Sequence, residues 1–477
     1  MTHPSQFMCY TNHPPIIIIM TSAIGAYRRT VHLCTQQYLT SKLKLGLGAH
    51  KFTRMLPQQY QAVVQTALEQ GVDTFDCPSD EAPLVEMIGQ AVTVLQRVGY
   101  RTIQAPEEAR EGDLLLEEQN DSTTTTNKVV HNLSVSYIHH AVESSALLSN
   151  KHIYPIPMVH NPEVHGADVA DRLTEAFCGL EELVATHDRI QNFGVVSNGL
   201  SLPKDHPLYL DYKVVLQAAD QAKKELGRTQ SAFSIFQLPA NLTETRGIQV
   251  AREIKQLRPD LSVYAMRPLT YYPDFGSGTG HGAALLDYLL PQGPKQQEWT
   301  HLMAGPPKFY HQVLNLALSH FDGEALLEAK LERSLTPEEE ETLDGAKVLQ
   351  SLLREMDAGI DTVTSFSQHE HHLMNVVIPT LASSFEELDE PSSHLLSNYF
   401  AAHGWTVRHR LATNTRKLLQ AGGDGIPAYD IPNHVTLQEY ALAHLFQETS
   451  FDKVIMGATQ SQQIVDAMNV CKASVAS

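Results

Sequence analysis

The chain is poor in cysteine and in positive charge, and it lacks long apolar runs. Its 477 residues include five cysteines, none in a CxxC pair, which fits a reducing compartment better than a disulfide framework. Acidic residues number 54 against 35 lysines and arginines, giving a formal net charge of −19. Since phosphate binding needs clustered cations, we expect no nucleic-acid partner. No apolar run approaches the ~20 residues that span a bilayer, so we expect no membrane partner.

The N-terminal 43 residues contain no acidic side chain. Glu69 is the first acid, whereas Arg28, Arg29 and Lys42 add positive charge among many serines and threonines. Acid-poor, basic, hydroxyl-rich leaders are typical of organelle transit peptides. Two interpretations of residues 1–43 stay open. A transit peptide implies a mitochondrion or plastid, whereas a disordered tail or a wrongly assigned start leaves the protein cytoplasmic.

From residue 44 onward, strand patterns alternate with helix patterns. Short apolar runs predict strands that are buried on both faces, as in a parallel sheet. Pro57 and Gly71 mark the start and end of the first helix. The predicted strands are 44–48, 72–76, 92–98, 153–160, 190–197, 232–237, 262–267 and 453–457. Eight βα units in order predict an α/β fold, a parallel (β/α)8 TIM barrel.

A doubly wound sheet is the alternative fold. It needs a glycine-rich turn after the first strand, and residues 46–51 do not supply one. Gly278–Ala283 matches the dinucleotide pattern G-x-G-x-x-A, but the residues before it make a poor strand, so a loop is the preferred interpretation.

Two segments interrupt the barrel pattern. Residues 101–130 are acidic and contain four consecutive threonines, which predicts a disordered loop. Residues 286–445 are mostly helical, with a capping box at Thr336–Glu339, and predict a helical insertion that could bind a protein partner. The expected organisation is a leader over 1–43, barrel units one to seven over 44–285, the insertion over 286–445, and the eighth unit over 446–477.

Polar residues occur where most of the predicted strands end. They are Asp76, Arg97, His160, Ser197, Asn198, Gln237 and Arg267, with Gly457 ending the last strand. Barrel enzymes carry their chemistry at this C-terminal face. A single polar residue at a strand end is more often structural, but the whole set predicts a site at one mouth.

Six motifs occur in order at these strands: Gly71–Asp76, Met158–Glu163, Phe193–Asn198, Gln237–Asn241, Met266–Leu269 and Ile455–Thr459. Through them the chain, over about 44–270 and 450–470, resembles the aldo-keto reductases, a family with an NADP-dependent oxidoreductase domain. The resemblance implies hydride transfer between a nicotinamide cofactor and a small-molecule carbonyl or alcohol.

The family's proton relay is a tetrad of Asp, Tyr, Lys and His. By the resemblance, Asp76 and His160 match the Asp and the His, while Arg97 stands at the Lys position. The Tyr is expected about five residues after Asp76, where residues 77–81 contain no phenol. The family's Tyr protonates the developing alkoxide, so its absence predicts loss of much of the ~10²–10⁴-fold contributed by general acid catalysis.

Four residues are candidates to replace the missing acid. His160 could donate as an imidazolium, since an ordinary histidine titrates near neutrality. Asp80 or Glu81 could donate if burial raised its pKa, and Tyr100 follows the third strand closely. Each is more simply explained as a bystander.

The resemblance also implies cofactor contacts. Ser197, Asn198 and Gln237 match residues that bind the nicotinamide carboxamide. Gly457 and the helix that starts near Ser461 suit a pyrophosphate, which favours a helix N-terminus. Further expected cofactor contacts are Arg267, Thr459 and Gln463. Because residues 457–470 contain no lysine or arginine, the sequence leaves NADP and NAD both open.

Two hypotheses follow. The first is an aldo-keto reductase-like oxidoreductase with an altered relay; the second is an inactive barrel that binds a nicotinamide or a protein partner. We expect no metal, because His369–His372 lacks the HExxH spacing.

Overall fold

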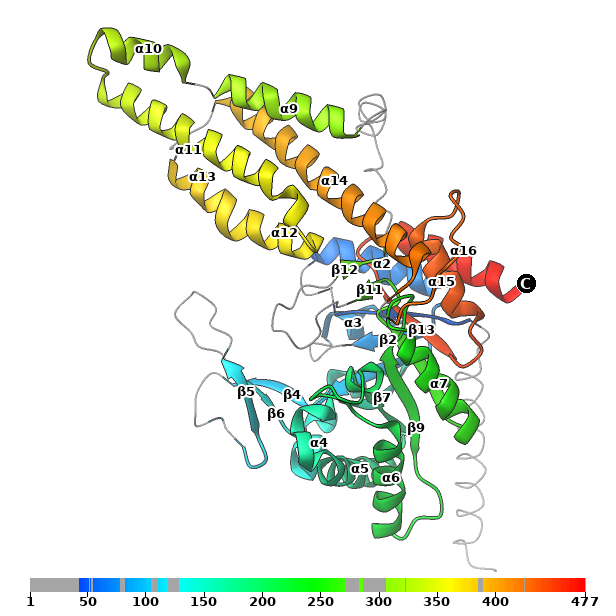
Figure 1. Cartoon of the computed structure of the whole chain (residues 1–477). Coiled ribbons are helices and arrows are strands. Elements are labelled where there is room, and N and C mark those ends of the chain that lie inside the picture. The colour runs from blue at the N-terminus through cyan, green and yellow to red at the C-terminus, as the bar shows by residue number, and fades with distance from the viewer. Residues whose placement is uncertain are drawn as a thin grey trace, which may run out of the picture.

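Eight parallel strands close into a barrel in the computed structural model (Figure 1). The described residues are 43–50, 52, 55–77, 82–103, 108, 110–118, 128–271, 283–285, 306–321, 323–384, 389–423 and 425–476. The strands are β1 (Leu45–Gly48), β2 (Thr74–Cys77), β3 (Val92–Val98), β7 (Ile153–His160), β8 (Phe193–Val196), β9 (Phe233–Pro239), β10 (Ser262–Met266) and β13 (Lys453–Gly457). They pair in the order β1-β13-β10-β9-β8-β7-β3-β2, with β2 returning to β1. The predicted α/β (β/α)8 class is confirmed, and the doubly wound alternative is excluded.

Helices surround the barrel in the expected alternation. They are α2 (Pro57–Glu69), α3 (Ala82–Met87), α4 (Val135–Glu143), α5 (Val169–Thr186), α6 (Tyr212–Glu225), α7 (Thr245–Leu257), α15 (Leu437–Gln447) and α16 (Ser461–Ala476). Helix α2 illustrates why they form. Pro57 takes its first position, Val63 and Val64 face the core, and Gly71 has φ +85° just beyond its end. Proline at the start and a left-handed glycine past the end are common helix boundaries.

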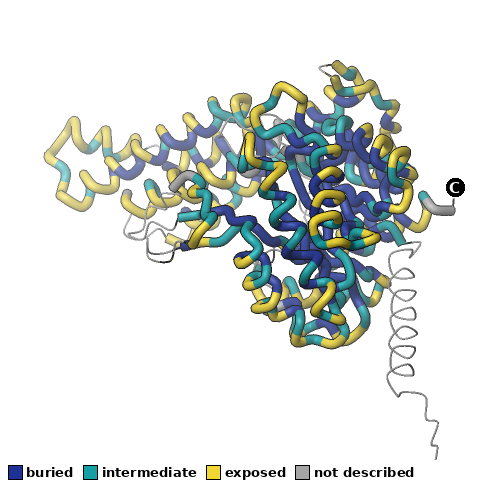
Figure 2. Tube along the Cα trace, turned by 90° about the horizontal axis from the view of Figure 1, so that it is seen from below, coloured by how far each residue is buried: buried dark blue, intermediate teal, exposed yellow. Residues whose placement is uncertain are grey.

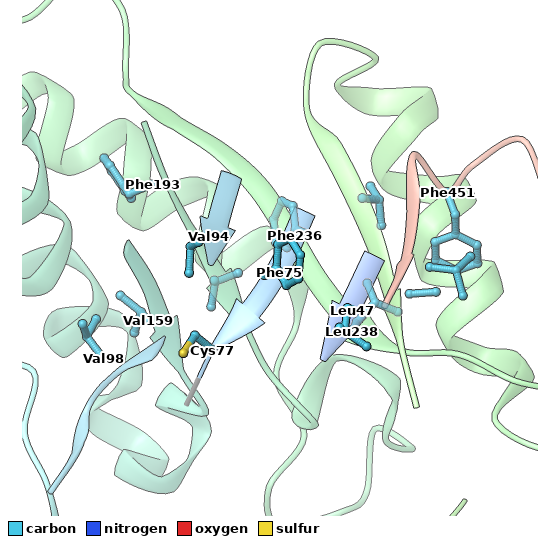
Figure 3. Packing of buried hydrophobic residues seen from close by; sticks show 14 of the residues in the cluster. Leu47, Phe75, Cys77, Val94, Val98, Val159, Phe193, Phe236, Leu238 and Phe451 are labelled. Carbon is cyan, nitrogen blue, oxygen red and sulfur yellow. The ribbon is translucent and has the colours of Figure 1, made fainter. Parts of the chain in front are cut away.

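Two apolar layers hold the barrel together. One fills its interior, where it packs Leu95, Ile156, Met158, Val196, Ile235, Tyr264, Met266 and Ile455. The other lies between the strands and the helices and includes Leu47, Phe75 and Phe236 (Figure 3). Because neighbouring residues of a strand face opposite sides, every barrel strand except β1 and β2 contributes to both layers. The barrel is therefore filled with side chains, and ligands have access only to its ends.

A helical bundle is inserted between β10 and α15. It comprises α9 (Pro306–His320), α10 (Glu324–Glu332), α11 (Pro337–Gly359), α12 (Phe366–His372), α13 (Ile378–Ser384) and α14 (Glu390–Ala421). The bundle projects from the barrel (Figure 2). It has its own core around Tyr310, Leu349 and Tyr399. The predicted capping box is present, since Thr336 accepts from the Glu339 backbone N–H.

The predicted end of the insertion at residue 445 is wrong. Leu442, Leu445 and Phe446 belong to the barrel core, so α15 is a barrel helix, and the insertion ends before Leu437. The boundary is hard to read from sequence because a barrel helix follows bundle helices without a change in apolar spacing.

The predicted disordered loop over 101–130 is also partly wrong. Strands β4 (Tyr100–Ile103), β5 (Leu114–Glu118) and β6 (Lys128–His131) form a small antiparallel sheet in the order β4-β6-β5. Asp113 anchors it through ion-pair contacts with Arg101 and a 2.8 Å hydrogen bond from Asn132. The acidic composition suggested disorder, but an acidic residue such as Asp113 has ion-pair and hydrogen-bond partners within this segment. Composition alone therefore did not predict the sheet. The threonine tract lies outside the described residues.

Other predictions fall outside the described residues. They concern the leader, except Leu43, and the glycines of the Gly278–Ala283 motif. None of the helices described is both long and apolar enough to cross a membrane.

Candidate functional site at the barrel mouth

Asp76 of β2, Arg97 of β3 and His160 of β7 meet at the C-terminal mouth of the barrel. Arg97 Nε and Nη2 donate to the two carboxylate oxygens of Asp76 at 2.9 and 2.6 Å. Arg97 Nη1 lies 3.1 Å from His160 Nε2. Parallel pairing of adjacent strands explains the meeting, since β2 pairs with β3 and β3 with β7. The structure thus brings together Asp76, Arg97 and His160, the three residues predicted from the sequence to lie at one mouth.

Asp76 and Arg97 form a buried ion pair. Only 4% of Asp76 is exposed. Burial alone would raise the pKa of its carboxyl, but the charge and hydrogen bonds of Arg97, with a bond from Gln237, outweigh burial and lower the pKa. Burial would likewise lower the pKa of Arg97, but the Asp76 charge leaves it raised. Both groups are therefore ionised at neutral pH.

His160 is neutral and its proton is on Nδ1. Burial first, then the charges of Arg97 and His131, hold the His160 pKa well below its ordinary value. A guanidinium can only donate, so His160 Nε2 must accept from Arg97 and cannot carry a proton. The hypothesis that His160 donates as an imidazolium conflicts with this geometry. Asp80 and Glu81, the carboxyl candidates, lie outside the described residues.

The rings of Tyr100, His131 and His165 form a cluster next to His160. The Tyr100 ring centroid is 4.9 Å from that of His160 and 4.6 Å from that of His131. His131 Nε2 donates to the His160 backbone oxygen at 2.7 Å, and its Nδ1 lies 2.9 Å from His165 Nε2. Burial is the main cause that lowers the pKa of His131 to about 4. Sequence reasoning missed His131, because it adjoins the segment taken for a disordered loop.

Tyr100 is near the mouth but is a weak acid. Its hydroxyl accepts a 3.4 Å hydrogen bond from Asn161 Nδ2. Burial is the main cause that raises the pKa of Tyr100. The family's Tyr has the opposite shift, because its Lys lowers the pKa. Tyr100 is therefore a poor replacement for the missing phenol.

Gly99 gives the first testable prediction. Its φ is +137°, and a Cβ there would lie 2.6 Å from His131 Nε2. We expect Gly99→Ala to lower the free energy of unfolding by about 2 kcal/mol or more, from backbone strain and this overlap. Urea unfolding followed by circular dichroism measures the loss. Gly89→Ala is the control, because Gly89 has open space around it; equal stability of the two variants would contradict the prediction.

Gln237 links the ion pair to the far side of the barrel. Its Nε2 donates to Asp76 Oδ2 at 2.7 Å, and the residue is fully buried. The other amide atom, Oε1, has no hydrogen-bond partner among the described residues. Because a carboxylate only accepts, the amide cannot be flipped without losing the bond to Asp76. An unsatisfied buried acceptor is costly, so a ligand that donates to Oε1 would be stabilised here.

Ser197 and Asn198 both form hydrogen bonds with other residues of the protein. Ser197 Oγ donates to Glu163 Oε2 at 2.8 Å, and the Gly199 N–H donates to Glu163 Oε1 at 2.8 Å. Asn198 contacts Asn161 Oδ1 through its backbone and side-chain nitrogens at 3.1 and 3.3 Å. Burial is the main cause that raises the pKa of Glu163. Both predicted carboxamide contacts are thus held in place, with the Ser197 hydroxyl turned toward Glu163.

Arg267 is part of a separate polar group beside the mouth. Its guanidinium contacts Glu244, and Asn241 Nδ2 donates to the Arg267 backbone oxygen at 3.1 Å. The backbone of Arg267 has φ +57°, a conformation that most residues avoid. The site thus orients Arg267 toward a carboxylate of the protein itself.

Gly457, Thr459 and Gln463 lie together at the N-terminus of α16. Gln463 Oε1 accepts from the backbone N–H groups of Thr459 and Gln460, at 2.9 and 3.3 Å. These are the donors that a pyrophosphate would use. Gln463 is exposed, so its side chain can be displaced by a ligand. Where the chain is described, no group of three or more His, Cys, Asp or Glu residues could hold a metal ion.

Comparisons with known proteins add little to this site. No family model matches the chain, and no curated protein matches it. Two solved structures from Pseudomonas aeruginosa, named as provisional aldo-keto reductases, are similar at 18% and 17% identity. They cover 47% and 48% of this chain and 74% of their own, with TM-scores of 0.33 and 0.32. Scores this low carry no argument, so the barrel class rests on the strand order, and the family resemblance rests on the motifs.

Proposed function

We propose that the barrel mouth binds a nicotinamide dinucleotide, NADP or NAD, and that the chain is an aldo-keto reductase-like oxidoreductase with an altered proton relay. The observation that carries the proposal is the contact of Arg97 with both Asp76 and His160. A bound reduced nicotinamide would supply the hydride for a carbonyl substrate. The free Oε1 of Gln237 fits the carboxamide NH2 group, which needs an acceptor.

Arg97 would stabilise the negative charge that develops on the carbonyl oxygen. A guanidinium has five N–H groups, and three of them serve Asp76 and His160. The remaining two could donate to an oxyanion at the mouth, where low dielectric strengthens such bonds. Arg97 cannot release a proton, and the Tyr100 pKa is raised. Turnover should therefore be slower than with a phenol beside the carbonyl.

The second candidate is a barrel that binds the cofactor without turnover. The geometry of His160 favours it, because its Nε2 accepts from Arg97 and cannot donate to a carbonyl oxygen. The two candidates share the cofactor and differ in chemistry. One experiment can therefore separate them.

The experiment is a fluorescence titration with NADPH and NADH, followed by assays with simple aldehydes. We expect binding of at least one cofactor, because Gln237 offers the buried acceptor. Gln237→Ala should weaken binding by about tenfold, the equivalent of one buried hydrogen bond. Gln217→Ala, on the exposed face of α6, is the control.

Each outcome decides between the candidates. Binding with aldehyde turnover supports the enzyme, and binding without turnover supports the second candidate. Failure to bind either cofactor would defeat both.

A further inference from the structure

A pocket lies between the loop after β8 and helix α7. Leu200, Leu210 and Val250 form its buried apolar floor, and Tyr209 and Tyr212 line it. The cavity has a volume of about 200 Å³. Ligand pockets commonly run from about 300 to 1,000 Å³, so this one suits a small molecule and is too small for a dinucleotide.

Three cations line the same pocket: Lys204, Lys213 and Arg246. In the described part of the chain, none of the three forms an ion pair with a carboxylate. The chain carries a net charge of −19, so three unpaired cations around one cavity call for a physical explanation. A negatively charged ligand would supply the missing partner.

The two carboxylates of the pocket are used internally. Asp211 caps α6 by accepting from the Lys213 backbone N–H at 3.0 Å. Glu253 is hydrogen-bonded to the Tyr212 side chain. Neither is positioned as the partner of a pocket cation, although both lower the net positive charge of the cavity to about one unit.

Arg246 is the best-placed anchor. Its guanidinium carbon lies 5.3 Å from the centroid of the Tyr209 ring, a cation–π contact that orients the planar group. Its Nε is buried and has no hydrogen-bond partner in the described part of the chain. Arg246 lies in the first turn of α7, whose N-cap Glu244 makes no side-chain cap bond. The guanidinium also hydrogen-bonds the Tyr209 side chain, which fixes its position and leaves the Nε–H to a ligand. A fixed guanidinium with an unsatisfied N–H, close to two lysines, favours a tetrahedral oxyanion.

The geometry points to a binding site for a small phosphate monoester, with the phosphate on Arg246, Lys204 and Lys213 and an apolar group on the leucine floor. This site is independent of the nicotinamide proposal. Its loop residues belong to the segment 199–211, which joins β8 to α6 and follows Ser197 and Asn198 directly in the chain.

The test is calorimetric titration of the full-length chain with phenyl phosphate, inorganic phosphate and benzoate. We expect phenyl phosphate to bind most tightly, because it alone combines the tetrahedral anion with an apolar ring. Arg246→Gln should weaken it by at least about tenfold, the usual value of a charge-assisted bond. Lys223→Met, which removes a partly exposed α6 cation paired with Asp220, is the matched control and should bind like the wild type.

Three results would overturn the site. One is no heat of binding with phenyl phosphate at millimolar concentration. Another is unchanged affinity in Arg246→Gln, which would assign the phosphate to another place such as the α16 N-terminus. If Arg246→Gln lowers thermal stability, Lys213→Met, at an exposed position, provides the second variant, and it should weaken binding several-fold. Equal binding of benzoate would rule out a phosphate-specific site.

Discussion

Replacing Asp76 by asparagine is expected to destabilise the folded protein by about 3 kcal/mol, the low end of the cost of breaking a buried ion pair. The low end applies because the Arg97 side chain keeps 20% of its surface exposed. The new amide would aim donor hydrogens at Arg97 or Gln237, both of which already donate to this position. Urea unfolding followed by circular dichroism gives the free energy of unfolding.

Asp220→Asn is the matched control for this variant. Asp220 pairs with Lys223 on the surface of α6, where 61% of its side chain is exposed. Exposed ion pairs contribute roughly 0–1 kcal/mol, so the control should unfold almost like the wild type. If Asp76→Asn unfolded at the same urea concentration as this control, the carboxylate and Arg97 would not be paired in the folded protein.

His131 is expected to make the protein less stable as the pH falls from about 6.5 to about 4. Its pKa in the folded protein is lowered to about 4 from an ordinary value of 6.5, mainly by burial. Between these values the unfolded chain binds a proton that the folded chain excludes. The contribution of neutral His131 to the free energy of unfolding is therefore fully present above pH 6.5. It is lost as the pH falls toward 4, by about 3 kcal/mol in total.

His131→Gln should remove this part of the pH dependence. Glutamine keeps an N–H that can donate to the His160 backbone oxygen, but it does not titrate. The free energy of unfolding, measured in urea from pH 7 to 4.5, should fall less steeply than in the wild type by about 1.4 kcal/mol per pH unit. His140→Gln, on an exposed position of α4, should keep the wild-type slope. Parallel curves for all three proteins would show that His131 is not buried in its neutral form.

The barrel could be predicted from the sequence because its strands are buried on both sides. Residues 92–98, 153–160 and 453–457 were predicted with the bounds of β3, β7 and β13. Such short apolar runs are typical of strands in a parallel sheet that is covered on both faces. The meeting of Asp76, Arg97 and His160 then followed from the rule that parallel strands end at one face.

The hydrogen-bond partners at the mouth could not be predicted. Ser197 and Gln237 were predicted as cofactor contacts, yet they donate to Glu163 and Asp76 in the folded chain. Strand-end position tells which residues share the mouth, but it does not tell which atoms face each other. The proton position on His160 likewise depends on one 3.1 Å contact with Arg97.

The small sheet around His131 escaped prediction for a different reason. Its strands β4, β5 and β6 are short and carry charged residues, so composition resembled that of an unfolded segment. Their order comes from long-range pairing, including Tyr100 opposite His131. Pairing between residues this far apart in the chain cannot be predicted from the local sequence pattern.

The position of the insertion has a consequence for biosynthesis. Strand β13 pairs with both β1 and β10, yet it is separated from β10 by the whole bundle and α15. While the ribosome translates that stretch, the nascent sheet has two open edges, for on the order of ten seconds or more at ~5–20 residues per second. Open edges invite pairing with other chains, so the nascent polypeptide should depend on chaperones until β13 emerges.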